Sequence, residues 1–201
     1  MQTAYEIRVG ENASDLSKNK NLLWNTGKIV TDQSLHVVYK GAELLSAKKY
    51  HWQVRVWDNH GKISAWSEPA FWQMGFLNAQ DWKAKWIQAG YKEDTVLWPS
   101  PLLRKSFTAS KNIKSATLFV TSHGLYESSI NVQRIGKAYL TPGFTSFNKR
   151  LQYQVYDVTK NLQQGKNTIG VALGNGWSRG NLVWEGKRDL YGNDLSLKNF
   201  L

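Results

Sequence analysis

Residues 50–57 read YHWQVRVW and decide the fold of the N-terminal part of the chain. Apolar and polar side chains alternate along this stretch, which places four large apolar residues on one face: Tyr50, Trp52, Val54 and Val56. A period of two is typical of a β-strand with one buried face. The DNHGK segment at residues 58–62 predicts a turn directly after this strand, because Asn and Gly tolerate positive φ.

Similar short alternations surround this strand at residues 4–9, 35–40 and 70–74, and no stretch with helical periodicity interrupts them. We therefore predict a β-sandwich of the immunoglobulin or fibronectin type III kind over residues 1–76. The AWSEP segment at residues 65–69 resembles the fibronectin type III pattern. That fold normally has a strand ahead of Ala4, so we expect the first strand to be missing and one sheet edge to be open.

A second β series begins after a junction. Residues 77–100 are too apolar for a free linker, and we expect them to form a packed junction. From Pro101 onward, strand-like alternation recurs with long connections between strands, such as residues 141–150. Long connections favour a jelly roll over a meander of hairpins. We predict a C-terminally truncated jelly-roll β-sandwich over residues 101–201, and thus an all-β chain.

An ordered series of short motifs supports this organisation. It comprises WKAKWI at 82–87, GLYE at 124–127, LTPGFTSFNKR at 140–150, YQVYDVT at 153–159 and GVALGNGW at 170–177. In this order and spacing, the series resembles the N-terminal jelly-roll module of bacterial α-L-rhamnosidases. Together with the fibronectin-like unit, the resemblance covers nearly the whole chain.

The resemblance implies a parent hydrolase that removes terminal α-L-rhamnose from glycans and plant glycosides. In that family a downstream (α/α)6 barrel carries the two catalytic carboxylates, which face each other across the bond. The family's catalytic acids match no position before Leu201, so we expect no catalytic residue and no activity of this chain alone. The resemblance predicts an accessory N-terminal fragment that scaffolds the enzyme or binds rhamnose. It also implies a periplasmic or extracellular parent, although residues 1–9 lack the pattern of a signal peptide.

The best candidate for a binding site is the glycine-rich loop at residues 174–194. Flat aromatic rings, amides and charged groups of the kind that bind sugars lie close together there. The predicted carbohydrate-binding residues are Asn175, Trp177, Arg179, Asn181, Trp184, Glu185 and Arg188. A structural role is the alternative, in which Trp177 and Trp184 pack against other parts of the parent and Arg179 holds the loop by salt bridges. Some modules of this type bind rhamnose with the help of Ca²⁺, so calcium is a candidate cofactor, but no residue here is assigned as a metal ligand.

One turn departs from the family pattern. Asn131 occupies the first position of an Asn-Gly hairpin in the related modules, and Val132 stands in place of the glycine. A β-branched residue disfavours the positive φ that a type I′ turn requires. We therefore expect altered geometry at this hairpin but no change of fold.

The composition narrows the classes of partner. The net charge is +11, but Lys and Arg are dispersed in ones and twos, which favours a solvated basic surface over a nucleic-acid site. No apolar run is long enough to span a membrane, and the absence of Cys excludes disulfides and thiolate metal sites. We expect a rhamnose-containing glycan and the parent's catalytic barrel as partners, and self-association through open strand edges. A protein-interaction module with a fibronectin-like domain is the alternative function.

Overall fold

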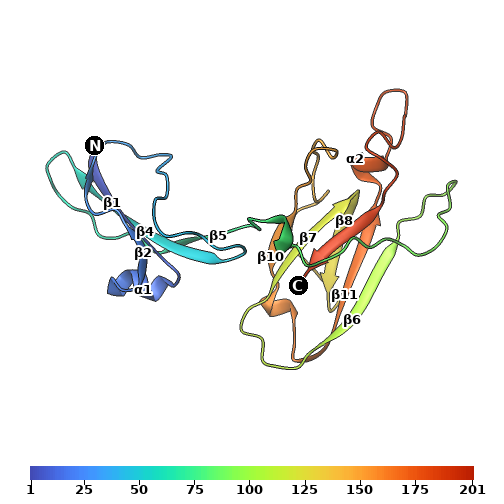
Figure 1. The fold of residues 1–201 in the computed structure, drawn as a ribbon, viewed down its shortest axis with the longest axis horizontal. Coiled ribbons are helices and arrows are strands. Elements are labelled where there is room, and N and C mark those ends of the chain that lie inside the picture. Colours follow the sequence, from blue (N-terminus) through green and yellow to red (C-terminus); the bar gives the residue numbers. More distant parts are fainter. The chain divides into compact units, whose positions relative to one another are not determined.

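The computed structural model describes residues 1–201, which form two compact units, unit 1 (Met1–Asp81) and unit 2 (Trp82–Leu201) (Figure 1). Strands make up most of the regular structure, which confirms the prediction of an all-β chain. The helical elements are short: α1 (Ala13–Lys18), η1 (Ala79–Asp81), η2 (Thr159–Asn161) and α2 (Gly176–Arg179). None of them has the length and apolar composition that a membrane-spanning helix requires.

Unit 1 is built on one antiparallel sheet with strand order β2-β1-β4-β5, in which β3 also pairs with β1. The strands are β1 (Gln2–Gly10), β2 (Leu22–Asn25), β3 (Ile29–Val30), β4 (Lys49–Asp58) and β5 (Ala70–Gln73). β1 and β4 pair in a register that sets Ile7 opposite Val54 and Val9 opposite Trp52. The alternation of residues 50–57 therefore produces one apolar sheet face, as the sequence predicts.

The polar face of this sheet explains the AWSEP motif. Arg55 Nε donates to Glu6 Oε2 over 2.8 Å, and its guanidinium lies 4.6 Å from the Trp66 ring centroid. Arg8 covers the same indole at 4.0 Å. The Ser67 amide donates to the Val54 carbonyl over 2.9 Å, which aligns the motif along β4. Trp66 thus packs against two arginines, where each contact combines apolar burial with cation–π attraction.

The prediction of a strand at residues 35–40 is wrong, because the structure shows coil there. His36 adopts a left-handed conformation, with φ of 56°, which interrupts the extended backbone. Within the segment only Val37 and Tyr39 are half-buried, while Leu35 and Val38 are exposed. The apolar face of the unit 1 sheet is therefore covered by coil and not by a second layer of strands.

Unit 2 is a two-sheet sandwich, in agreement with the predicted jelly roll. One sheet has the order β10-β7-β12 and the other β6-β11-β8-β9. Their bounds are β6 (Leu102–Ala109), β7 (Thr117–His123), β8 (Leu125–Ile130), β9 (Gln133–Arg134), β10 (Gln154–Asp157), β11 (Gly165–Gly174) and β12 (Ser196–Phe200). One buried cluster fills the space between the sheets, with Leu118, Val120, Ile130 and Leu197 almost fully buried.

The β8–β9 hairpin keeps a tight turn despite the missing glycine. Asn131 and Val132 both have positive φ, at 50° and 63°, and the Val132 side chain is fully exposed. The side chain of Asn131 holds the turn against β11. Its Nδ2 donates to Asn167 Oδ1 over 2.9 Å, and its Oδ1 accepts from the backbone amide of Thr168 over 3.0 Å. The expected change of hairpin geometry is therefore wrong, and the turn imposes backbone strain on Val132 instead.

Candidate functional site

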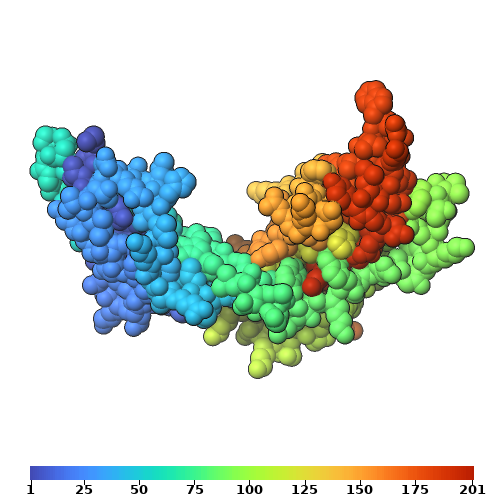
Figure 2. All heavy atoms as spheres, turned by 45° about the horizontal axis from the view of Figure 1, so that its top comes forward, coloured from blue at the N-terminus to red at the C-terminus, as the bar shows by residue number.

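The predicted binding loop starts where β11 ends. Asn175 follows β11 directly with helical backbone angles, and α2 comes next. Gly176 has φ of 53°, and a Cβ atom there would lie 2.5 Å from Leu125 Cγ, so this position requires glycine. The short helix turns the chain so that Arg179 is 97% buried, at 3% relative exposure, beneath the loop. Residues after it project from the body of unit 2 as the orange-red extension in Figure 2.

Arg179 is the centre of the polar groups at this end of unit 2. Its Nη2 donates to both carboxylate oxygens of Glu93 over 2.6 Å, and its Nη1 donates to the Asn193 carbonyl over 3.1 Å. The guanidinium also lies 5.1 Å from the ring centroid of Trp98. A buried guanidinium with this many partners is held in one orientation, as a binding site requires.

A cavity of about 150 Å³ adjoins this ion pair. It is lined by Gln88, Ala89, Tyr91, Glu93, Pro101, Arg179, Asn193 and Leu195. A carboxylate, a guanidinium, a phenol and two amides thus converge on a small space beside apolar side chains. This is the set of donors and acceptors that can bind neighbouring hydroxyl groups.

Two of the other predicted residues, Arg188 and Asn181, lie in one cluster around Trp98. The Arg188 guanidinium lies 4.1 Å from the ring centroid of Trp98, the same indole that Arg179 contacts. Arg188 Nη1 also donates to Asn181 Oδ1 over 3.5 Å. Its Nε and Nη2 are buried without a hydrogen-bond partner. Trp98 therefore joins the predicted residues Arg179, Arg188 and Asn181 into one cluster.

Trp177 does not line the cavity. Its ring makes an edge contact with Phe144 at 6.1 Å, in a chain of aromatic contacts that continues through Phe147 to Tyr191. Trp184 is fully exposed, and Glu185 forms an exposed ion pair with Lys187 at 2.9 Å. The structure thus separates Trp177, Trp184 and Glu185 from the polar cavity.

The donor set does not fit a calcium ion. Ca²⁺ takes six to eight oxygen ligands, usually with several carboxylates among them. No group of three or more His, Cys, Asp or Glu side chains that could hold a metal occurs in residues 1–201. Three carboxylates in or beside the loop already have cationic partners, since Glu93 binds Arg179, Asp194 binds His123 at 2.9 Å and Glu185 binds Lys187. We therefore assign no role to calcium.

Sequence reasoning missed Glu93, Trp98, Gln88 and Tyr91. They lie in the stretch expected to be a junction, which has no periodicity and no turn motif. The one available signal was the presence of Arg179, because a buried arginine needs an acidic partner from elsewhere in the chain.

Comparisons with known proteins agree with the motif series. A family model described as the α-L-rhamnosidase N-terminal domain matches residues 111–201, and one described as a Rha78A-like, N-terminal immunoglobulin domain matches residues 1–78. An α-L-rhamnosidase of Formosa agariphila is 37% identical over 190 residues, which cover 91% of this chain and 20% of that protein. The chain matches the N-terminal, non-catalytic region of α-L-rhamnosidases.

Solved α-L-rhamnosidase structures support the same assignment. The enzyme from Dictyoglumus thermophilum matches 98% of this chain and 23% of its own, with 34% identity and a TM-score of 0.84. The enzyme from Aspergillus terreus matches 98% of this chain and 22% of its own, with 32% identity and a TM-score of 0.88. The chain thus spans about a fifth of the length of these relatives and corresponds to their N-terminal, non-catalytic domains, as predicted.

Proposed function

We propose that this chain is the accessory N-terminal part of an α-L-rhamnosidase and that unit 2 binds a rhamnosyl group of the substrate in the cavity at Arg179. The observation that carries the proposal is the buried guanidinium of Arg179, paired with Glu93 beside a cavity lined by hydroxyl-binding groups. The ion pair fixes the donors before the ligand arrives, and preorganised donors bind a weak ligand at a smaller entropic cost.

The remaining predicted residues have supporting roles in this proposal. Arg188 and Asn181 hold Trp98 against Arg179, and Asn175 and Trp177 position the start of the loop. The exposed indole of Trp184 and the carboxylate of Glu185 contact sugar units beyond the terminal one. The relatives are named as α-L-rhamnosidases, so a rhamnose-containing glycan is the partner class, with the parent's catalytic domain as the second partner. Self-association through strand edges such as β6 remains part of the proposal.

Calorimetric titration of L-rhamnose into the chain tests this function. Tyr91 is 58% exposed at the cavity, so we expect Tyr91→Ala to weaken binding at least fivefold without unfolding unit 2. Tyr139→Ala is the matched control, because Tyr139 is also an exposed tyrosine of unit 2 but does not line this cavity. Absence of binding by the unmodified chain, or equal losses in both variants, would contradict the proposal.

A further inference from the structure

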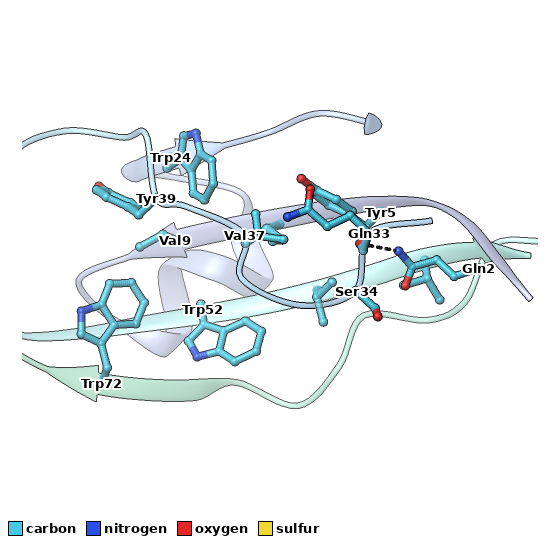
Figure 3. A pocket seen from close by; sticks show the side chains of 13 residues that line it. Gln2, Tyr5, Val9, Trp24, Gln33, Ser34, Val37, Tyr39, Trp52 and Trp72 are labelled. Carbon is cyan, nitrogen blue, oxygen red and sulfur yellow. Dashed lines mark hydrogen bonds between the residues drawn. The ribbon is translucent and has the colours of Figure 1, made fainter. Parts of the chain in front are cut away.

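A second and larger cavity lies in unit 1, where the coil at residues 31–40 covers the apolar face of the sheet (Figure 3). Its volume is about 410 Å³, within the range of ligand pockets and far above the voids of close-packed interiors. The register of β1 and β4 builds the floor from Tyr5, Ile7 and Val9 and their partners Val56, Val54 and Trp52.

The walls are aromatic and locked together. Tyr39 makes edge contacts with Trp24 at 5.1 Å and with Trp72 at 6.2 Å. Trp72 also packs at 5.6 Å against Tyr50, whose hydroxyl accepts a hydrogen bond from the Leu45 amide. Trp24, Trp52 and Trp72 all stay half-buried, so parts of their rings are open to a ligand.

The polar groups of this cavity are few, uncharged and placed at one end. Gln2, Gln33 and Ser34 lie together, away from the end that Trp24, Tyr39 and Trp72 form (Figure 3). Gln2 Nε2 donates to the Gln33 carbonyl over 3.0 Å, which ties the covering coil to β1. Although 20% of the residues of the chain are charged, none of the residues that line this cavity is. A charged ligand would lose its hydration in this cavity without gaining a counter-charge. A neutral ligand does not carry this desolvation cost.

We propose that this cavity of unit 1 binds the aryl group of a neutral aryl glycoside, with the aromatic ring among Trp24, Trp52 and Trp72 and the sugar hydroxyls at Gln33 and Ser34. The apolar end matches a flat ring, and the amide and hydroxyl end matches the glycosidic side of the ligand. The inference rests on the proposed function, because it takes the ligand to be a rhamnoside. Unit 1 then binds an aryl glycoside chiefly through its aglycone, at a site separate from the unit 2 cavity that binds a rhamnosyl group.

Two probes that differ by one ring test the inference on the whole chain. Phenyl α-L-rhamnoside is titrated by calorimetry in the presence of saturating methyl α-L-rhamnoside, which fills the unit 2 cavity but lacks the aromatic ring. We expect phenyl α-L-rhamnoside to bind at least tenfold more tightly than the methyl compound. Trp52→Leu should reduce this affinity at least tenfold, and Trp66→Leu, on the opposite face of the sheet, should leave it unchanged.

A second pair of variants decides the matter if Trp52→Leu does not fold. Ser34→Trp fills the mouth of the cavity and should abolish the gain from the phenyl ring, whereas Leu35→Trp, next to it but outside the lining, should not. Equal affinities of the two probes with methyl rhamnoside still bound at Arg179 would overturn this inference and leave the proposed function intact. If phenyl rhamnoside binds but methyl rhamnoside does not, the proposed function of unit 2 is overturned and the inference for unit 1 stands. Concentration-dependent dimers that Ser34→Trp abolishes would identify a second copy as the occupant and also overturn the inference.

Discussion

The cavity at Arg179 in unit 2 and the aromatic cavity of unit 1 differ in where the charged groups lie. In unit 2 the cavity is built around the ion pair of buried Arg179 and half-buried Glu93, and the apolar core lies elsewhere, between the two sheets. In unit 1 the charged pair of Arg55 and Glu6 lies on one face of the sheet, and the open aromatic cavity lies on the other. Similar β patterns therefore produce one polar cavity lined by charged groups and one neutral cavity lined by aromatic rings.

The two ion pairs provide the largest test of this contrast. Glu93→Gln leaves the Arg179 guanidinium, with 4% of its side chain exposed, without a counter-charge. Breaking a buried pair in this way should destabilise unit 2 by about 3 kcal/mol. Glu6→Gln should cost unit 1 less, about 1–2 kcal/mol, because Arg55 is 28% exposed and keeps its contact with Trp66.

Hydrogen exchange measured separately on amides of each unit reads out these losses, since the two units need not unfold together. The double variant Glu93→Gln with Arg179→Met should recover part of the stability by removing the unpaired charge. Equal losses in the two units would show that the unit 2 pair is no more important than the unit 1 pair.

A buried phenol in the unit 2 core predicts a loss of stability in alkali. Burial, and then the contact with Tyr156, raise the pKa of Tyr126 far above its usual value near 10. The folded state therefore binds the phenolic proton more tightly than the unfolded state. The contribution of Tyr126 to the free energy of unfolding is fully present below pH 10. Above pH 10 the free energy of unfolding falls by about 1.4 kcal/mol per pH unit.

Urea unfolding of unit 2 between pH 9 and pH 11 measures this slope. Tyr126→Phe should be less stable than the unmodified chain at pH 9, because Tyr126 donates to Gln154 Oε1 over 2.8 Å, but its slope above pH 10 should be smaller. In unit 1 burial also raises the pKa of Tyr39, but that ring is only half-buried, so Tyr39→Phe should change the slope less. A slope that Tyr126→Phe does not alter would refute this assignment.

The strained hairpin of unit 2 predicts a stabilising substitution. Val132→Gly removes a β-branched side chain at φ of 63° and breaks no contact, because the side chain is fully exposed. We expect a gain of about 1 kcal/mol and a melting temperature higher by about 3–5 °C. Asn131→Gly is the matched control at the same turn and should destabilise, since it removes the hydrogen bonds to Asn167 and Thr168.

The contrast between the units also explains what the sequence could predict. Local periodicity and motif order are written along the chain, so the β1–β4 pattern and the family resemblance lead directly to the fold. The predicted loop contains Arg179, but Glu93 is 86 residues away in sequence, and no local pattern links the two. Contacts between irregular segments depend on tertiary packing. The alternation of apolar and polar residues indicates a local strand and does not predict such contacts.

The strand predicted at residues 35–40 failed for a related reason. Leu35, Val37 and Tyr39 have the right spacing, but alternation alone does not supply a neighbouring strand with free hydrogen-bonding groups. With His36 in the left-handed region, the segment instead spans the sheet face as coil and leaves the aromatic cavity beneath it. The larger cavity thus lies where the sequence pattern was least informative.

Two acidic turns, one in each unit, predict the smallest effect. Asp58 Oδ1 accepts hydrogen bonds from the amides of Lys62 and His60 over 2.9 and 2.8 Å, and the bond from Lys62 contributes most to a lowered pKa of Asp58. Because the folded pKa lies below the unfolded one, this stabilisation is present above about pH 4 and is lost as the pH falls through the folded pKa. Asp94 in unit 2 accepts from the amides of Leu97 and Val96 in the same way, and its pKa is also lowered.

Asp58→Asn keeps an acceptor oxygen but cannot titrate. The variant should therefore be slightly less stable than the unmodified chain at pH 5, and the difference should shrink at pH 2.5, as measured by unfolding of unit 1. Asp94→Asn should reproduce this convergence in unit 2 and leave unit 1 unchanged, because each Oδ1 accepts hydrogen bonds from amides of its own turn. A stability difference that is the same at both pH values would mean that the carboxylate charge does not stabilise these turns. Charge-dependent stability of the two units would then come from ion pairs such as those at Glu93 and Glu6.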